Sequence, residues 1–221
     1  MNAPLPFPAP PAVPPRAAAR AVAEREARLQ QTAQWRPAIL LGAGSLLLAG
    51  ALYAAGGTTL ARLAFPAQSD GSLLRDANGA VRGSALLAQP FAGDGWFQSR
   101  PSAAGHDPMA AAGSNMARSN PALAARVAEA TAAVAAREEI APADVPADLV
   151  TQSGGGLDPH LSPAAAQVQV RRVARVRGLS EPELRALVRA HTEGRQWGVF
   201  GQPRVNVMRL NQALMEHARA Q

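Results

Sequence analysis

The longest uninterrupted apolar stretch of the chain covers residues 37–61. Its 25 residues carry no charge, and the cationic residues that bound it are Arg36 and Arg62. As a helix with a rise of about 1.5 Å per residue, the stretch is roughly 37 Å long and exceeds the hydrocarbon thickness of a bilayer, about 30 Å. A buried helix of this length without charge is unusual in a small soluble domain. The pattern predicts a transmembrane anchor over residues 36–62.

The segment before this anchor is rich in Pro and Ala. Residues 1–15, MNAPLPFPAPPAVPP, cannot form the interior of a helix and offer little to bury, so we expect them to be disordered. The Ala-rich residues 17–34 predict a short exposed helix. A cleaved signal peptide is the main rival interpretation, but its apolar region is normally about 7–15 residues long. We therefore expect a retained signal anchor behind a Pro/Ala-rich tail of residues 1–35.

The charges that flank the anchor indicate its orientation. More Arg residues lie within about 20 residues of its N-terminal end than within the same distance of its C-terminal end. They are Arg20, Arg25, Arg28 and Arg36 on the first side and Arg62 and Arg75 on the second. Because cationic flanks stay in the cytoplasm, we expect a single-pass protein of the bacterial inner membrane with a cytoplasmic tail. Residues 63–221 are then extracytoplasmic.

Small residues four apart recur within the anchor. Ser45 is followed by Ala49, and Gly50 by Ala54. This spacing lets a second helix approach closely in lipid, where packing drives association. We name these four residues as candidates for contact with a partner helix, although Gly and Ala can equally be filler.

Residues 63–221 combine strand and helix signals. Two apolar runs flank Asn78-Gly79, a dipeptide that strongly indicates a β-hairpin. Segments with helical periodicity follow, separated by loops rich in Gly, Ser, Asn and Pro. The fold class expected is an α+β soluble domain that follows a single N-terminal transmembrane helix and a disordered Pro/Ala-rich tail.

Four segments of this domain carry helix-start signals. In two of them Asn or Ser precedes Pro, a favoured first helical residue. A third has a capping box, Ser180 with Glu183, and in the fourth Asn precedes an amphipathic pattern. The expected helices cover residues 121–138, 163–177, 181–191 and 207–220. In the last, Val207, Leu210 and Leu214 lie on one face.

The amino-acid composition excludes several classes of catalytic and binding chemistry. The 221 residues carry a formal net charge of +6, and all 22 cationic side chains are Arg, since the chain has no Lys. Without Lys the chain cannot form the phosphate-binding loop of P-loop proteins or a Schiff base. It also has no Cys, which excludes disulfides, thiolate nucleophiles and cysteine-ligated metals. Aromatic residues make up only 4%, so the core must be largely aliphatic.

The remaining candidates for catalysis and metal binding are weak. His106, Asp107, Asp158 and His160 do not fall in a tight metal-ligand spacing, and Asp-Pro steps more often form turns. No Gly-x-Ser-x-Gly elbow positions a nucleophilic serine. We expect neither a catalytic residue nor a metal site.

A basic run occupies positions 171, 172, 175 and 177, all Arg. On a helix the first three fall on one face, but they alternate with Val in a domain of few aromatic residues. We expect a solvated face, or a patch that meets an acidic partner or lipid headgroups, rather than a nucleic-acid site.

A family resemblance rests on ordered strings behind the anchor. In sequence they are DGSLLRDANGAVRGSALLAQPF, RPSAAGHDP, GSNMARSNPAL, DLVTQSGGGLDPHLSPAAA, VARVRGLS and HTEGRQWGVFGQPRVNVMRLN. With them, about residues 36–214 resemble the KdpC family, the C subunit of the Kdp potassium-transporting P-type ATPase.

The resemblance implies a non-catalytic subunit without a cofactor of its own, in a complex that handles ATP and potassium. Its partners would be a channel-like potassium-translocating subunit, a P-type ATPase subunit and a small single-span subunit. The family has been proposed to act as a catalytic chaperone that raises the ATP affinity of the ATPase subunit. A P-type pump phosphorylates Asp in an Asp-Lys-Thr-Gly motif, which a chain without Lys cannot contain. The alternative is a free-standing, membrane-anchored extracytoplasmic enzyme or binding module.

The stretch TQSGGGLDPHLSP, residues 151–163, admits two interpretations. Glycine-rich loops can offer backbone N–H groups to phosphate, which makes Gln152, Ser153, Gly154, Gly155 and Gly156 weak candidates for nucleotide contact. An extracytoplasmic loop, however, lies across the membrane from cytoplasmic ATP, and the nearest following cation in the chain is Arg171.

We therefore expect a structural loop that turns the chain and caps the next helix, with Asp158 and His160 as candidates for contact with the potassium-translocating subunit. On this hypothesis Gly155→Val and Asp158→Ala lower the stability or assembly of the complex.

Overall fold

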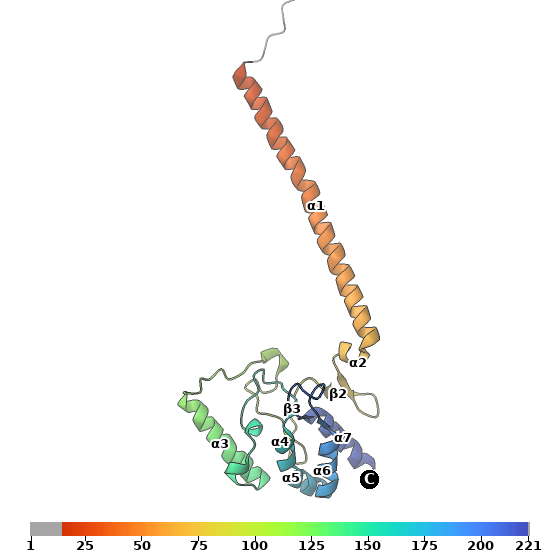
Figure 1. The fold of residues 1–221 in the computed structure, drawn as a ribbon, viewed down its shortest axis with the longest axis vertical. Helices are drawn as coiled ribbons and strands as arrows, with labels where there is room; N and C mark the ends of the chain where they lie inside the picture. The colour runs from red at the N-terminus through yellow and green to blue at the C-terminus, as the bar shows by residue number, and fades with distance from the viewer. Residues whose placement is uncertain (1–14, 221) are drawn as a thin grey trace, which may run out of the picture. The chain divides into compact units, whose positions relative to one another are not determined.

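The computed structural model describes residues 15–220. The chain divides into two compact units that meet in sequence between Ala64 and Phe65. The first unit contains the single helix α1, Arg16–Ala64, and the second contains all other elements (Figure 1). The disorder expected for residues 1–15 concerns positions that, apart from residue 15, lie outside the described residues.

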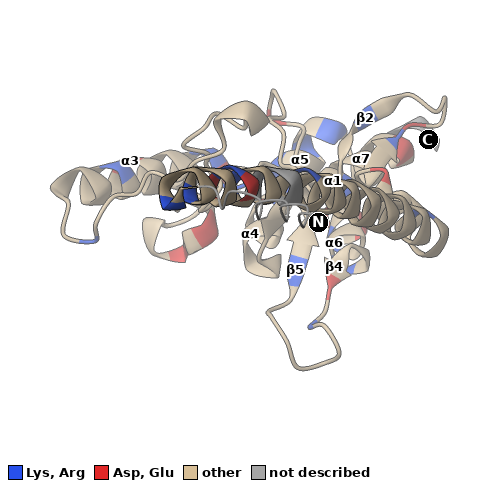
Figure 2. Ribbon diagram, turned by 90° about the horizontal axis from the view of Figure 1, so that it is seen from above, with Lys and Arg blue, Asp and Glu red and all other residues tan. Residues whose placement is uncertain are grey.

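Helix α1 is one continuous helix of 49 residues, long and apolar enough to cross a membrane. The sequence predicts a short helix before a separate anchor, whereas the structure joins the two through Pro37. An interior Pro removes one backbone hydrogen bond, at a cost of about 3 kcal/mol. The Ala-rich turns before it and the uncharged turns after it favour helix strongly enough to continue across this position. Figure 2 shows charged residues near the N-terminal end of α1 and a long uncharged part beyond them.

The second unit begins with α2, Pro66–Ser69, and the predicted hairpin follows. Strand β1, Leu73–Arg75, pairs antiparallel with β2, Val81–Ser84, and the prediction is confirmed. The carboxylate of Asp76 organises the turn because it accepts hydrogen bonds from the backbone N–H groups of residues 78 and 80. The guanidinium of Arg82 also donates to it, and this contact lowers the pKa of Asp76.

The helices that follow β2 start where the sequence predicts, except α5, for which no separate start was predicted. They are α3 Pro121–Glu138, α4 Pro163–Val168, α5 Val170–Arg177, α6 Glu181–Ala190 and α7 Val207–Ala220, with short 3-10 turns η1 Pro108–Ala110, η2 Pro142–Asp144 and η3 Ala147–Leu149. Asn120 and Ser162 accept hydrogen bonds from backbone N–H groups at the starts of α3 and α4, and Ser180 with Glu183 forms the predicted capping box. The single helix expected over 163–177 is divided at Gln169.

A second, three-stranded sheet has no counterpart in the sequence-based expectations. Its strands are β3, His160–Leu161, β4, Thr192–Glu193, and β5, Arg204–Asn206, in the order β3-β5-β4 with antiparallel pairing. Two or three residues are too few to show an alternating pattern. The sheet places the loop that ends at β3 beside the start of α7.

The core of the unit is aliphatic, as the composition requires. Helix α6 packs against α4, α5 and α7, which lie side by side in Figure 1. The predicted face of α7 is confirmed, since Val207, Leu210 and Leu214 are fully buried. Phe97 is the largest fully buried side chain, and it comes from an irregular segment rather than from a helix or strand.

Candidate functional site

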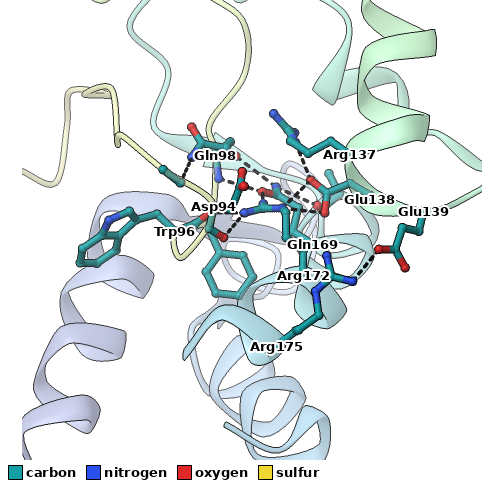
Figure 3. Close-up of polar contacts among 12 residues, drawn as sticks. Asp94, Trp96, Gln98, Arg137, Glu138, Glu139, Gln169, Arg172 and Arg175 are labelled. Atoms are coloured by element: carbon teal, nitrogen blue, oxygen red, sulfur yellow. Dashed lines mark hydrogen bonds and ion pairs between the residues drawn. The ribbon is translucent and has the colours of Figure 1, made fainter. Parts of the chain in front are cut away.

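Buried polar side chains hold the irregular segment 94–98 (Figure 3). Asn211 of α7 accepts from the backbone N–H of Phe97 at 3.0 Å and donates to its carbonyl at 2.9 Å. Gln169 does the same for Gln98, accepting at 2.8 Å and donating at 3.1 Å. The two amides thus supply the hydrogen bonds that a neighbouring strand would give, and an irregular backbone can lie inside the core.

Arg172 of α5 lies at the centre of this network (Figure 3). Its side chain is 3% exposed and pairs with Glu138, which is fully buried, through an Nε–Oε2 distance of 3.0 Å. It also donates to the carbonyls of Asp94 and Trp96 and to Gln169. The expectation of a solvated or partner-facing basic run is therefore wrong for Arg172. Apart from Gln169, its partners lie 34 to 78 residues away in the chain, which no local pattern reveals.

The other cations of the run also have partners within the unit. Arg171 and Arg175 are exposed, and both pair with Glu139, whose pKa is lowered by the hydrogen bond from Arg175 and by its charge. Arg177 donates to the carbonyl of Gly95, and its guanidinium lies 3.9 Å from the centroid of the Trp96 ring. The run thus ties α5 to the end of α3 and to segment 94–98.

The glycine stretch of loop 151–163 is ordered by its neighbours. Ser153 is buried and donates its N–H to the carbonyl of Pro101, while Gly156 donates to Ser153. Gly156 is buried with φ +72°, and a Cβ there would lie 2.9 Å from the carbonyl oxygen of Ala112. Gly154 and Gly155 are exposed, and within the part of the chain that the structure describes no hydrogen bond engages their N–H groups.

Two cations distant in sequence lie beside this loop. Arg100 donates to the hydroxyl of Thr151 and the carbonyl of Gln152, and Arg126 of α3 donates to the side chain of Gln152. The sequence around the loop gives no sign of either, since the nearest following cation is Arg171. Their contacts are to oxygens of the loop itself, and the buried Nε of each has no partner among the described residues. This arrangement fixes the start of the loop.

The end of the loop is held against β5. Asp158 accepts from the backbone N–H of His160 and lies 3.0 Å from its ring Nδ1, which must carry the proton because a carboxylate only accepts. The hydrogen bond from His160 lowers the pKa of Asp158, and the charge of Arg100 acts in the same direction. The carbonyl of Pro159 accepts from the N–H of Val207 at 2.8 Å. Asp158 and His160 are each partly exposed.

The helix that follows is capped as expected. Ser162 accepts from the N–H of Ala165 at 3.1 Å, and its own N–H and hydroxyl donate to Asp148 of η3. The sequence suggested the cap but not Asp148, which lies 14 residues earlier. The whole stretch is thus connected to α3, η3 and β5.

A pH dependence follows from the lowered pKa of Asp158. Its carboxylate favours the folded state above the ordinary pKa of Asp, about 3.9, and this contribution is lost as the pH falls through the lower folded-state value. The thermal midpoint of the wild type is therefore expected to exceed that of Asp158→Asn at pH 6, and the difference is expected to shrink below about pH 4. A difference that is constant from pH 6 to pH 3 would contradict this origin. Differential scanning calorimetry of both proteins in the same detergent measures it.

The four candidate residues of the anchor are exposed on α1, and a Cβ at Gly50 would meet nothing within 4 Å. At about 100° per residue, Ser45 and Ala49 share one face, while Gly50 and Ala54 share a second face roughly 140° away. The structure therefore gives α1 two separate small-residue faces rather than one continuous stripe.

The metal-ligand candidates have other partners. Within residues 15–220 no group of three or more His, Asp or Glu side chains is placed to hold a metal ion. Nε2 of His106 lies 3.2 Å from the hydroxyl of Ser99, and Asp107 caps η1 by accepting from the N–H of Met109. Both residues thus shape the loop before α3.

The sequence of this chain matches known proteins over most of its length. Residues 35–216 match the family model of KdpC, described as K+-transporting ATPase, c chain. A potassium-transporting ATPase KdpC subunit of Xanthomonas campestris pv. campestris (strain B100) is 58% identical over 169 residues, which cover 76% of this chain and 80% of the relative.

Other bacteria have similar proteins of the same description. That of Shewanella putrefaciens is 50% identical over 79% of this chain and 87% of the relative. That of Sorangium cellulosum is 51% identical over 82% of this chain and 97% of the relative. The match includes α1 from residue 35 onward, loop 151–163 and most of α7, and the chain belongs to the KdpC family of potassium-transporting ATPase subunits.

Proposed function

We propose that this chain is the non-catalytic accessory subunit of an ATP-driven potassium uptake complex in a bacterial inner membrane. The observation that carries the proposal is the family match over residues 35–216, in a chain without the Lys that an Asp-Lys-Thr-Gly phosphorylation motif requires. ATP hydrolysis then belongs to a partner P-type subunit and potassium passage to a channel-like subunit, with a small single-span subunit completing the complex. The subunit supports assembly and raises the ATP affinity of the ATPase subunit.

The topology proposed is a cytoplasmic N-terminus, a single span within α1 and an extracytoplasmic second unit. The excess of Arg before the span supports this orientation. In this arrangement loop 151–163 does not meet cytoplasmic ATP, and we assign it a structural role with an outer surface for the potassium-translocating subunit. The exposed Gly154 and Gly155 and the partly exposed Asp158 and His160 are the residues available for that contact.

Reporter fusions after Gly71 test the topology. A periplasmic phosphatase fused there is expected to be active, and a fluorescent protein that matures only in the cytoplasm is expected to remain dark. The physical reason is that the cationic flank of α1 is retained on the cytoplasmic side. A fluorescent cytoplasmic reporter with an inactive phosphatase would show the opposite orientation, in which loop 151–163 lies on the cytoplasmic side, where ATP is present.

The small-residue faces of α1 are tested by enlarging one residue on each. Ala49→Leu and Gly50→Leu are expected to reduce recovery of the intact complex in mild detergent, because a larger side chain separates helices that pack closely. Leu47→Ile, a change between large exposed side chains, is the matched control. Wild-type recovery of both Leu variants, measured by affinity purification and subunit staining, would leave the small residues without a packing role.

A further inference from the structure

The connection between β4 and β5 exposes an apolar tip. Residues 194–203, here the 194–203 finger, are all exposed, and Figure 2 shows this loop extending away from the helices of the second unit. Trp197 is 81% exposed, Val199 69% and Phe200 59%. A tryptophan and a phenylalanine left so open carry apolar surface that the unit itself does not cover.

Hydrogen bonds give the finger a defined shape. Gln196 and Phe200 form an antiparallel bridge, with N–H to carbonyl distances of 2.9 and 3.0 Å in the two directions. Within the turn, the N–H of Gly198 donates to the carbonyl of Arg195 at 3.1 Å. The rings of Trp197 and Phe200 lie edge to face, 6.0 Å apart. The tip is therefore a preformed aromatic pair rather than an open coil.

The tip also carries backbone strain. Trp197 has φ +52° and Gly198 has φ +77°. The left-handed region suits Gly but is unusual for a bulky side chain. Trp197 is not buried within the unit, so packing inside the unit does not compensate for the strained backbone conformation. Strain of this kind persists mainly at sites of recognition or catalysis, where it fixes a side chain in position.

The base of the finger is cationic. Arg195 lies before the tip and Arg204 follows it at the start of β5, and no acidic residue lies between them. Arg204 pairs with Glu193, and Arg195 donates to Gln202. Tryptophan, phenylalanine and arginine side chains grouped in this way are typical of the centre of a protein–protein interface.

We infer that the 194–203 finger docks into an apolar pocket, rimmed by carboxylate or carbonyl oxygens, on another protein subunit of the potassium-transporting complex. The inference rests on the proposed function, which places this chain among partner subunits. A lipid surface accepts aromatic side chains without requiring one shape, whereas a pocket on a protein selects the fixed and strained tip. The docked Trp197 and Phe200 would provide most of the contact, since each aromatic side chain can bury about 150–250 Å².

Photo-crosslinking from the tip tests the inference in the whole complex. Benzoylphenylalanine is placed at position 197 of the tagged full-length chain, and at position 109 as a control, because Met109 is 92% exposed on η1. Irradiation of intact cells is expected to give an adduct from position 197, identified by mass spectrometry as another subunit of the ATPase complex, and none from position 109. Adducts only to lipid or to a second copy of this chain, or no adduct, would overturn the inference.

Substitution measures how much the finger contributes. Trp197→Ser with Phe200→Ser is expected to lower recovery of the complex about tenfold or more, as hot-spot residues do, without changing the thermal midpoint of the isolated chain. Met109→Ser is the matched control and should leave recovery unchanged. If the wild-type chain recovers the complex but the finger variant does so equally well, this inference fails alone. If the wild-type chain recovers no ATPase subunit, the proposed function itself fails.

Discussion

Arg172→Ala is expected to lower the free energy of unfolding of the second unit by about 3–5 kcal/mol. The change removes the buried partner of Glu138 and leaves that carboxylate with Arg137 alone, whose side chain is only partly buried. It also removes donors from the carbonyls of Asp94 and Trp96. Because whole domains are stable by only about 5–15 kcal/mol, this is a large fraction of the total.

Urea unfolding of the full chain in detergent, followed by tryptophan fluorescence, measures the effect, and Trp96 lies within the network. Arg175→Ala is the matched control, because it removes an exposed ion pair on the same helix, and exposed ion pairs contribute much less to stability than buried ones. Equal losses from the two variants would show that the buried network does not hold segment 94–98.

Gly156→Ala is expected to lower the free energy of unfolding by roughly 2–5 kcal/mol, the second-largest effect. About 1–2 kcal/mol comes from a side chain in the left-handed region, since φ is +72°, and about 1–3 from overpacking. The new Cβ would lie 2.9 Å from both the carbonyl oxygen of Ala112 and the hydroxyl of Ser102. The same urea unfolding measurement applies.

Gly155→Ala provides the comparison one residue away. A Cβ at Gly155 meets nothing within 4 Å, so the free energy of unfolding of the isolated chain should change by no more than about 0.5 kcal/mol. This refines the expectation for Gly155→Val, because any loss of assembly must then arise from a partner rather than from crowding in this chain. A large loss of stability from Gly155→Ala, or none from Gly156→Ala, would contradict the loop geometry.

Local sequence patterns were sufficient to predict those elements that depend only on residues close together in the chain. The Asn78-Gly79 hairpin, the caps at Asn120 and Ser162 and the capping box at Ser180 each need only residues a few positions apart, and the structure confirms them. The strands at 160–161, 192–193 and 204–206 were missed because they are defined by pairing between distant segments.

The candidate site could be predicted even less well, because most of its contacts join residues that are distant in the chain. The glycine stretch was visible in the sequence, but Arg100 and Arg126 reach it from 26 to 52 residues away. The spacing of Arg172 from Arg171 and Arg175 predicts a solvated helix face. Its burial depends on Glu138 and on two carbonyls of segment 94–98. A buried cation differs from an exposed one only through such long-range partners.

The central claim is that this chain serves an ATPase whose catalytic residues lie on another subunit. The most direct test is ATP hydrolysis by the complex, purified through a tag on the ATPase subunit from cells with and without this chain, as a function of ATP concentration at saturating potassium. We predict that the chain alone hydrolyses no ATP, and that without it the complex is either not recovered or shows a higher KM for ATP. Unchanged yield, kcat and KM in its absence would contradict the account.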